Sequence, residues 1–579
     1  MNSSSIDASW RRVVALSVLV PLLSVALRTA DARAIEVRAQ SAPAVQQASS
    51  PRIELTVGTI SGIQVLAPRP VRTFLGIPYA APPTGPLRWQ APQPVARWAG
   101  VRQAVQFGPR CMQHASGKPS FRSTRVSEDC LYLNVWAPDP GKDEKRPVLV
   151  YFHGGNLNEG DASESRYDGA NLAEIGIVTV TVNYRLGVFG FLALPSARHE
   201  SSDSAVGNYG LLDQVAALRW VRDNIASFGG DPAKVTIAGD TGGAVAVSAH
   251  MASPQSRGLF ARAIAQSGGA FGRQAVWSRS RAEKLAARFA TQVGAWTLPQ
   301  LRAMSAEQLL AATGSERGPK FVFWPHVDSQ FLTDTPEAIF NSGGQAPVPL
   351  LLGNRSQEGH VGPMLLGAKP TPENWKQALE RLFGEQAAQA MSHYPGNDND
   401  EVVRSATVLA GDLAAAHATW RWMSLHRQTG SGSPVYLYVY DRMPSSAAGA
   451  SERRASIAQS DLQVDPALGN LNLLPRHGWR AEDYLASGAL LRYLVQFVKT
   501  GDPNGPRDNP LRYWSALGLG GPARPPSWPA AREEQGGLAR QTIDVTPRTT
   551  WDRSAARQDF IGRFIATQAF DDTWIDKRR

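Results

Sequence analysis

The residue best placed in this sequence to act as a nucleophile is a threonine, Thr241, within the run Gly239-Asp240-Thr241-Gly242-Gly243. The preceding run Lys234-Val-Thr-Ile-Ala238 predicts a buried strand, and the following run Ala244-Val-Ala-Val-Ser-Ala-His250 predicts the start of a helix. A Gly-x-nucleophile-x-Gly turn between a strand and a helix presents a hydroxyl at a tight bend, normally that of a serine. The bend strains the backbone of its central residue, and a β-branched side chain suits that conformation poorly. The pattern is therefore typical of a nucleophile turn for acyl transfer, whereas a threonine at its centre is poorly suited to that chemistry.

Short characteristic runs follow one another along the chain on both sides of this turn. They are Gly76-Ile-Pro-Tyr-Ala80, Pro82-Pro83-Thr-Gly85, Leu87-Arg88-Trp89, Ser127-Glu-Asp-Cys-Leu-Tyr-Leu-Asn-Val135, Asn183-Tyr-Arg-Leu-Gly187, Gly207-Asn-Tyr-Gly-Leu-Leu-Asp-Gln214, Phe228-Gly-Gly-Asp-Pro232, Gln266-Ser-Gly268 and Gly501-Asp-Pro-Asn-Gly505. Their order resembles that of the type-B carboxylesterase/cholinesterase family of α/β-hydrolases. The resemblance implies an α/β-hydrolase fold: a mostly parallel central sheet flanked by helices, with helical excursions that form a cap over the cleft.

The resemblance also implies which groups assist Thr241. Pro147-Val-Leu-Val-Tyr-Phe152 predicts a buried strand, and His153-Gly154-Gly155-Asn156-Leu157 after it is similar to the family's His-Gly-Gly-Gly-Phe loop. The backbone amides of Gly155, Asn156 and Gly242 are therefore expected to form the oxyanion hole. Glu358, after the predicted strand Val348-Pro-Leu-Leu-Leu352, matches the carboxylate of the family's catalytic triad.

The triad's base has no counterpart in the sequence. Ser433–Arg442 is similar to the strand before the family's histidine loop, but the stretch from Ser445 to Leu468 contains no histidine. Gly469-Asn-Leu471 resembles the segment after that loop, and an ungapped count back from Gly469 puts Ser460 at the histidine position. A count forward from Gly449-Ala450 puts Glu452 there instead. Neither side chain acts as an imidazole base near neutral pH.

Other histidines are candidates for a replacement base. The sequence has ten histidines, and most are expected to be packing or surface residues. His326 and His360 are positioned in the sequence to approach the expected cleft, and His477 lies a few residues after the expected histidine loop. The default expectation is that none of the three serves as the base. His153 is expected to have a structural role in its loop.

The N-terminal segment is typical of an export signal. Arg11 and Arg12 precede the apolar run Val13–Leu27, and Ala32-Arg33-Ala34 offers a small-residue cleavage site. An uncleaved membrane anchor is the alternative, although the run is short for a membrane span. We therefore divide the chain into a signal peptide, a flexible linker, a hydrolase domain and a tail, at residues 1–34, 35–51, 52–570 and 571–579.

The chain has only two cysteines, Cys111 and Cys130. Both stand where the family has its first disulfide loop, so the resemblance implies a disulfide between them. Export to the periplasm or the medium would supply the oxidising compartment that such a bond needs. Two free buried thiols are the alternative.

Composition narrows the range of partners. With 43% hydrophobic residues over 579 positions, the chain can bury a large core. The formal charge is +10, but the basic residues are scattered, which argues against a nucleic-acid partner. The Gly- and Pro-rich stretch from Gly518 to Trp528 predicts a surface loop.

Two functions remain open at this point. The first is an exported carboxylic ester hydrolase with a remodelled triad: Thr241 attacks, Glu358 orients, and an unidentified group is the base. The second is a catalytically inactive hydrolase-fold protein that binds a small ester-like or apolar ligand, or a protein partner. No residues stand at metal-ligand spacing, and no cofactor or membrane span after signal cleavage is expected.

Overall fold

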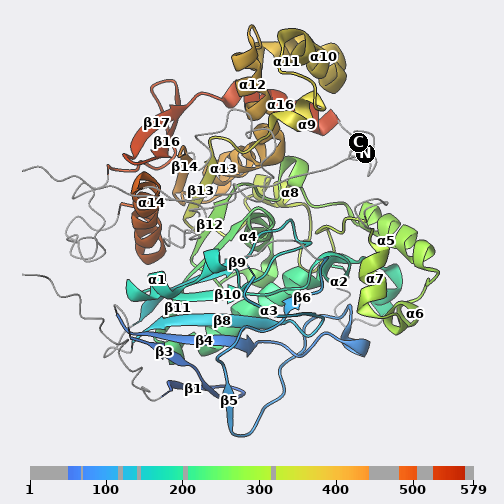
Figure 1. Cartoon of the computed structure of the whole chain (residues 1–579), viewed down its shortest axis with the longest axis vertical. Coiled ribbons are helices and arrows are strands. Elements are labelled where there is room, and N and C mark those ends of the chain that lie inside the picture. The colour runs from blue at the N-terminus through green and yellow to red at the C-terminus, as the bar shows by residue number, and fades with distance from the viewer. Residues whose placement is uncertain are drawn as a thin grey trace, which may run out of the picture. The chain divides into compact units, whose positions relative to one another are not determined.

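A computed structural model gives the fold (Figure 1). The predicted signal peptide and the C-terminal tail lie outside the described residues, as do Glu452, Ser460 and His477. The structure describes residues 50–66, 69–114, 121–139, 145–199, 207–314, 321–442, 481–504 and 526–567.

A large mixed sheet organises the described part of the chain. Its strand order is β15-β16-β14-β13-β12-β11-β9-β10-β8-β4-β3, and β17 pairs with β16. The strands from β10 to β16 along this order are parallel to one another, and the outer strands on both sides are antiparallel. The strands are β3 (Ile63–Val65), β4 (Val71–Pro78), β8 (Tyr132–Pro138), β9 (Arg146–Phe152), β10 (Val178–Val182), β11 (Gly230–Asp240), β12 (Arg262–Gln266), β13 (Leu350–Arg355), β14 (Val435–Tyr440), β15 (Glu533–Glu534), β16 (Gly537–Ile543) and β17 (Arg548–Asp552).

Shorter strands lie apart from this sheet. They are β1 (Arg52–Leu55), β2 (Gly58–Ser61) and β5 (Val101–Gln103) in one small sheet, and β6 (Arg110–Cys111) and β7 (Val126–Ser127) in another. The helices are α1 (Ala170–Glu174), α2 (Gly187–Phe191), α3 (Tyr209–Asn224), α4 (Gly242–Ala252), α5 (Arg279–Val293), α6 (Leu298–Ala303), α7 (Ala306–Ala312), α8 (Pro336–Asn341), α9 (Val361–Leu365), α10 (Pro372–Phe383), α11 (Ala387–His393), α12 (Asn399–Gly411), α13 (His417–Thr429), α14 (Ala481–Thr500) and α16 (Ala555–Thr567).

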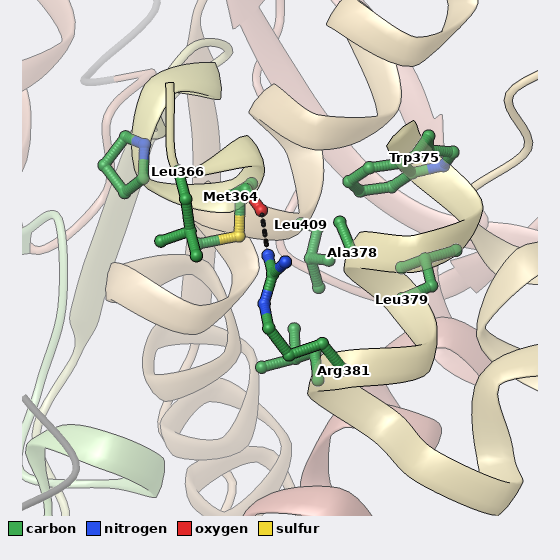
Figure 2. A pocket seen from close by; sticks show the side chains of 9 residues that line it. Met364, Leu366, Trp375, Ala378, Leu379, Arg381 and Leu409 are labelled. Atoms are coloured by element: carbon green, nitrogen blue, oxygen red, sulfur yellow. Dashed lines mark hydrogen bonds between the residues drawn. The ribbon is translucent and has the colours of Figure 1, made fainter. Parts of the chain in front are cut away.

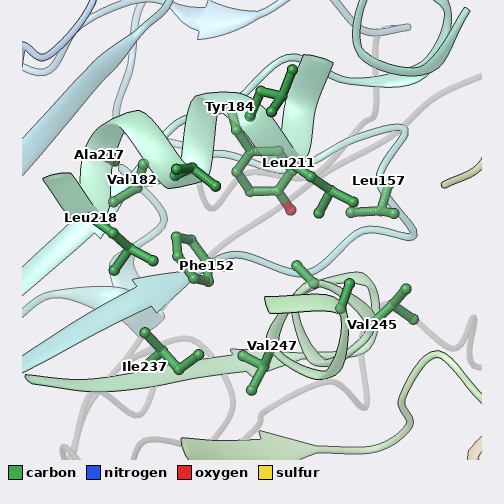
Figure 3. Packing of buried hydrophobic residues seen from close by; sticks show 14 of the residues in the cluster. Phe152, Leu157, Val182, Tyr184, Leu211, Ala217, Leu218, Ile237, Val245 and Val247 are labelled. Carbon is green, nitrogen blue, oxygen red and sulfur yellow. The ribbon is translucent and has the colours of Figure 1, made fainter. Parts of the chain in front are cut away.

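Both faces of the parallel strands are buried, as the apolar runs in the sequence predict. Successive side chains of a strand point to opposite faces. In β9, Phe152 packs in one core cluster with residues of α3 and α4, whereas Tyr151 packs in a second cluster with residues of α14. Figure 3 shows Phe152 among the side chains of the first cluster, including Leu218 of α3 and Val247 of α4. The layered, mostly parallel α/β architecture that the sequence predicts is confirmed.

The strands and the helix predicted around Thr241 are also present. β9 and β11 include the predicted strands, and α4 includes the predicted helix. Long helical insertions separate the later strands: α5 to α8 lie between β12 and β13, and α9 to α13 lie between β13 and β14. Within the described ranges, none of the helices combines the length and hydropathy needed to cross a bilayer.

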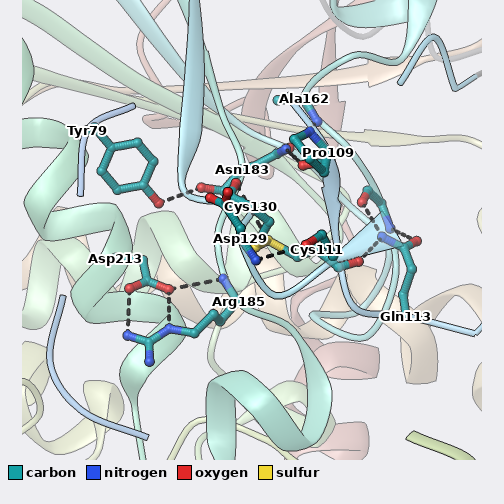
Figure 4. The surroundings of a disulfide bond; sticks show 12 residues. Tyr79, Pro109, Cys111, Gln113, Asp129, Cys130, Ala162, Asn183, Arg185 and Asp213 are labelled. Carbon is teal, nitrogen blue, oxygen red and sulfur yellow. Dashed lines mark hydrogen bonds and ion pairs between the residues drawn. A yellow bond between two sulfur atoms is a disulfide. The ribbon is translucent and has the colours of Figure 1, made fainter. Parts of the chain in front are cut away.

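Two further expectations can be compared with the structure. Cys111 and Cys130 form the implied disulfide, beside the buried ion pair of Arg185 and Asp213 (Figure 4).

The surface-loop prediction for Gly518–Trp528 is wrong at its last residue. Trp528 is fully buried, and its ring packs edge-on against Tyr493 of α14 and Tyr438 of β14.

Candidate active site

Thr241 lies at the sharp turn between β11 and α4, as predicted. Its backbone has φ 48° and ψ −109°, a conformation that is a genuine outlier for a β-branched residue. The turn is tight because its glycines touch other backbone: a Cβ at Gly239 would lie 2.5 Å from the carbonyl carbon of Gly243, and one at Gly243 would overlap the carbonyl oxygen of Phe152. The Thr241 N–H donates to the carbonyl oxygen of Gln266 on β12 over 2.9 Å, which ties the turn to the neighbouring strand.

The loop after β9 brings backbone amides to Thr241. The N–H of Gly155 donates to Thr241 Oγ1 over 3.3 Å. Asn156 has φ 52°, a left-handed backbone conformation that asparagine adopts more readily than most residues. A Cβ added at Gly242 would lie 2.9 Å from the nitrogen of Asn156, so the two segments are in close contact. The structure thus brings together Gly155, Asn156 and Gly242 around the Thr241 turn.

The core holds this loop in place. The His153 ring stacks on Tyr184, with ring centroids 4.3 Å apart, and the Tyr184 hydroxyl donates to the His153 carbonyl oxygen over 2.6 Å. Burial lowers the pKa of His153, so its neutral form is favoured. Leu157, at the end of the loop, is fully buried in the cluster of Figure 3. His153 therefore packs and orients the loop.

Glu358 lies three residues beyond β13, within a loop fixed by several hydrogen bonds. Its Oε1 accepts from the hydroxyl of Ser267, which follows β12, and from the N–H of Arg355 over 2.8 Å. The Arg355 guanidinium pairs with Oε2 over 3.3 Å. Ser267 directly follows Gln266, and the carbonyl oxygen of Gln266 accepts from the Thr241 N–H. The short segment of Gln266 and Ser267 therefore contacts both the Thr241 turn and the loop that carries Glu358.

A cavity of about 390 Å³ opens beside Glu358. Its walls mix polar and apolar groups and include the charged residues Arg355, Asp441 and Arg557 as well as Glu358, but not Thr241. The pocket in Figure 2, between α9, α10 and α12, has a volume of only about 10 Å³, the space of roughly one water molecule. None of the predicted site residues lines this pocket.

A second group of polar residues surrounds Asp240, which the sequence reading overlooked. Asp240 Oδ1 accepts from the hydroxyls of Tyr151 and Tyr167, each over 2.9 Å. Its Oδ2 pairs with Arg166 Nη1 over 3.3 Å, and Arg166 also pairs with Glu164. Asp240 is 3% exposed, so this carboxylate is buried directly before the nucleophile. The only available signal was an acidic residue at the end of an otherwise apolar strand.

The histidines whose side chains are described do not supply the missing base. Thr241 and Glu358 have no hydrogen bond to an imidazole of any of these histidines. His250 bonds Ser256 Oγ and Gln214 Oε1, and burial lowers its pKa to about 3. The other histidines with described hydrogen bonds or ring contacts bond or stack elsewhere: His114 on Thr313, His326 on the carbonyl of Trp324, His393 on Phe560, His417 on Gln558 and His426 on the carbonyl of Val348.

His360 is the N-cap residue of α9, where burial lowers its pKa. Ser460 and His477 cannot be placed, because they lie outside the described residues. Among the described residues, no group of three or more His, Cys, Asp or Glu side chains is placed to hold a metal ion.

Comparison with known proteins identifies the family of the chain. The model of the carboxylesterase family matches residues 49–556. Fumonisin B1 esterase of Sphingopyxis macrogoltabida is 34% identical over 72% of this chain and 76% of its own length. The para-nitrobenzyl esterase of Bacillus subtilis is 35% identical over 75% of this chain and 87% of its own length. The cocaine esterase of Oryctolagus cuniculus is 34% identical over 78% of this chain and 86% of its own length. The chain belongs to the carboxylesterase family.

Proposed function

We propose that this protein is an exported carboxylic ester hydrolase with a remodelled triad, in which Thr241 is the nucleophile and Glu358 is the acid. The observation that carries the proposal is the conformation of Thr241. A β-branched residue keeps a strained positive φ only where its surroundings impose it, and such strain gathers at functional sites. Here the strain holds a hydroxyl 3.3 Å from a backbone N–H donor.

The amides of Gly155, Asn156 and Gly242 would stabilise the oxyanion that forms when Thr241 attacks an ester carbonyl. Three esterases with different named substrates share about a third of their residues with this chain, which supports a small-molecule ester as the substrate class. The Cys111–Cys130 disulfide supports export to the periplasm or the medium, where such bonds persist.

A second candidate function is ligand binding without catalysis. It is favoured by one observation: none of the described imidazoles hydrogen-bonds to Thr241. Loss of the base in a serine-type triad typically costs about a million-fold in turnover. The oxyanion hole and binding alone retain roughly a thousand-fold over the uncatalysed rate. In this case the protein would hold an ester or a similar apolar ligand, or a protein partner, through the same fold.

Hydrolysis of p-nitrophenyl acetate and butyrate by the mature protein separates the two functions. We expect slow hydrolysis that Thr241→Ala abolishes and that Thr291→Ala, the same change on an exposed face of α5, leaves intact. A fluorophosphonate probe should add slowly to Thr241, as located by peptide mass mapping. A folded wild-type protein that neither hydrolyses these esters nor takes up the probe would favour the non-catalytic function.

A further inference from the structure

The Asp240 carboxylate and the Thr241 hydroxyl meet on one side of Gly154. Asp240 Oδ2 and Thr241 Oγ1 both lie within 2.5 Å of the position that a Cβ would take at Gly154, so at most about 5 Å separates the two oxygens. This spacing allows proton transfer directly after a small side-chain rotation or through one bridging water. The two side chains can approach the Gly154 backbone this closely because residue 154 has no side chain.

We propose that Asp240 is the general base that activates Thr241, in place of the family's histidine. The inference rests on the proposed function, since it supplies the base which that mechanism leaves open. Asp240 Oδ2 is a carboxylate oxygen that the structure places beside the Thr241 hydroxyl, at Gly154. Glu358 is held by Ser267 and Arg355, and it makes no hydrogen bond to Thr241.

The hydrogen bonds of Asp240 leave Oδ2, the oxygen beside Gly154, able to accept a proton. Oδ1 accepts two hydrogen bonds, from Tyr151 on β9 and from Tyr167. Oδ2 has one longer contact, the 3.3 Å ion pair with Arg166. A carboxylate offers about four acceptor positions, so Oδ2 keeps capacity for a proton on the side of Gly154. The two tyrosines and Arg166 fix the group, and Glu164 balances part of the charge of Arg166.

The proton balance closes over two half-reactions. Asp240 Oδ2 takes the hydroxyl proton as Thr241 Oγ1 bonds to the acyl carbon, and the carbonyl oxygen becomes an oxyanion held by backbone N–H groups. Collapse breaks the bond to the alkoxy oxygen, which leaves as the alcohol with the proton from Asp240. Water then attacks the acyl-threonine, Asp240 takes a proton from that water, and the proton returns to Oγ1 as the acid leaves. One ester and one water thus give one acid and one alcohol.

Hydrolysis of p-nitrophenyl acetate by four variants of the mature protein tests this role. Asp240→Asn should lower kcat/KM by about a hundred-fold or more, the usual contribution of a general base. Asp240→Ala should lower it similarly and should recover at least tenfold with added sodium formate, which supplies a small carboxylate. Formate should not rescue Thr241→Ala. Asp168→Asn is the control, because Asp168 is a neighbouring carboxylate that pairs with Arg122. Its kcat/KM should equal that of the wild type.

The pH profile of the wild type is a readout that needs no variant to fold. Carboxylates remain ionised at pH 5.5, where about nine-tenths of imidazoles of ordinary acidity are protonated. We expect kcat/KM to stay within about twofold between pH 7.5 and 5.5, whereas an imidazole base predicts about a tenfold fall.

The outcomes separate this inference from the proposed function. The role of Asp240 is overturned if the Thr241-dependent activity of Asp240→Asn stays within threefold of the wild type. It is also overturned if the wild-type activity falls tenfold by pH 5.5. Either result leaves the proposed hydrolase function intact. A reduced Asp240→Ala activity that formate does not restore means that Asp240 has only a structural role. A folded wild type without any Thr241-dependent turnover overturns both.

Discussion

Gly155 donates its backbone N–H to the hydroxyl oxygen of Thr241 over 3.3 Å. Under the proposed function, an amide expected to bind the oxyanion is thus occupied by the proposed nucleophile before an ester enters. On attack, this N–H would turn from the hydroxyl oxygen to the substrate oxygen, and the hydroxyl would donate its proton to the proposed base. The hydrogen bond would therefore hold Thr241 next to the position of the reacting carbonyl.

The strained turn predicts a stability gain on substitution. Thr241→Gly should raise the free energy of unfolding by about 1 kcal/mol, because a non-glycine residue in such a region costs about 1–3 kcal/mol and one neutral hydrogen bond returns about 1 kcal/mol. Thr291→Gly, on an exposed helix face, should lower it by roughly 0.5 kcal/mol. Urea denaturation of both variants measures the difference. A less stable Thr241→Gly protein would show that the turn is not strained.

The close approach at Gly154 predicts a loss of function from a single methyl group. In Gly154→Ala the new Cβ would overlap Asp240 Oδ2 and lie 2.5 Å from Thr241 Oγ1, so the turn has to move. We expect at least a tenfold lower ester turnover and about 1–3 kcal/mol lower stability. Gly362→Ala is the matched control, since a Cβ there meets nothing within 4 Å. Equal activity of the two variants would contradict the packing around the nucleophile.

His250 predicts a stability loss in acid. Burial lowers the pKa of His250 from 6.5 to about 3, so below pH 6.5 the unfolded chain binds a proton that the folded chain does not. Stability should therefore fall as the pH drops from 6.5 towards 3. This residue alone should account for about 2 kcal/mol between pH 7 and pH 5. His250→Gln should be less stable at pH 7 but should lose less on acidification, as followed by urea denaturation at each pH.

The disulfide predicts a redox-dependent stability. Cys111 and Cys130 close a loop with a sequence separation of 19 residues, which should contribute about 3 kcal/mol by restricting the unfolded chain. Cys111→Ala/Cys130→Ala should lower the free energy of unfolding by this amount. The wild type under reducing conditions should behave in the same way, and the double variant should no longer respond to reductant. Non-reducing peptide mapping that finds free thiols in the protein purified without reductant would contradict the assignment.

Much of the fold could be predicted from local patterns. The apolar runs at β9, β11 and β13 and the glycine-bounded turn at Thr241 signal their structure within a few residues of sequence. Trp528 shows the limit of this reasoning. Its neighbours are Gly and Pro, which predict a loop, but three aromatic residues from β14 and α14 enclose its ring.

The site was also predictable only in part, because contacts between segments far apart in the sequence leave no local pattern. Thr241, the amide loop and Glu358 each stand in a recognisable run, so their positions could be predicted. The surroundings of Asp240 could not, because Tyr151 comes from β9 and Tyr167 and Arg166 come from a separate segment. No spacing in the sequence links these side chains. Likewise, only the folded packing shows that His250 is enclosed by Ser256 and Gln214.

The neighbouring order of β11, β12 and β13 has a consequence for laboratory evolution. Asp240, Gln266 and Gly353 pair side by side across these strands, Thr241 and Ser267 directly follow the first two, and Glu358 lies three residues beyond the end of β13. The proposed nucleophile and acid are thus carried by neighbouring, hydrogen-bonded strands, which a mutant library can leave unchanged. Under the proposed function, a selection for faster ester turnover would vary Ser445 to Leu468, where the resemblance to the family predicts a histidine, and clones with a new imidazole there would show whether such a base raises turnover.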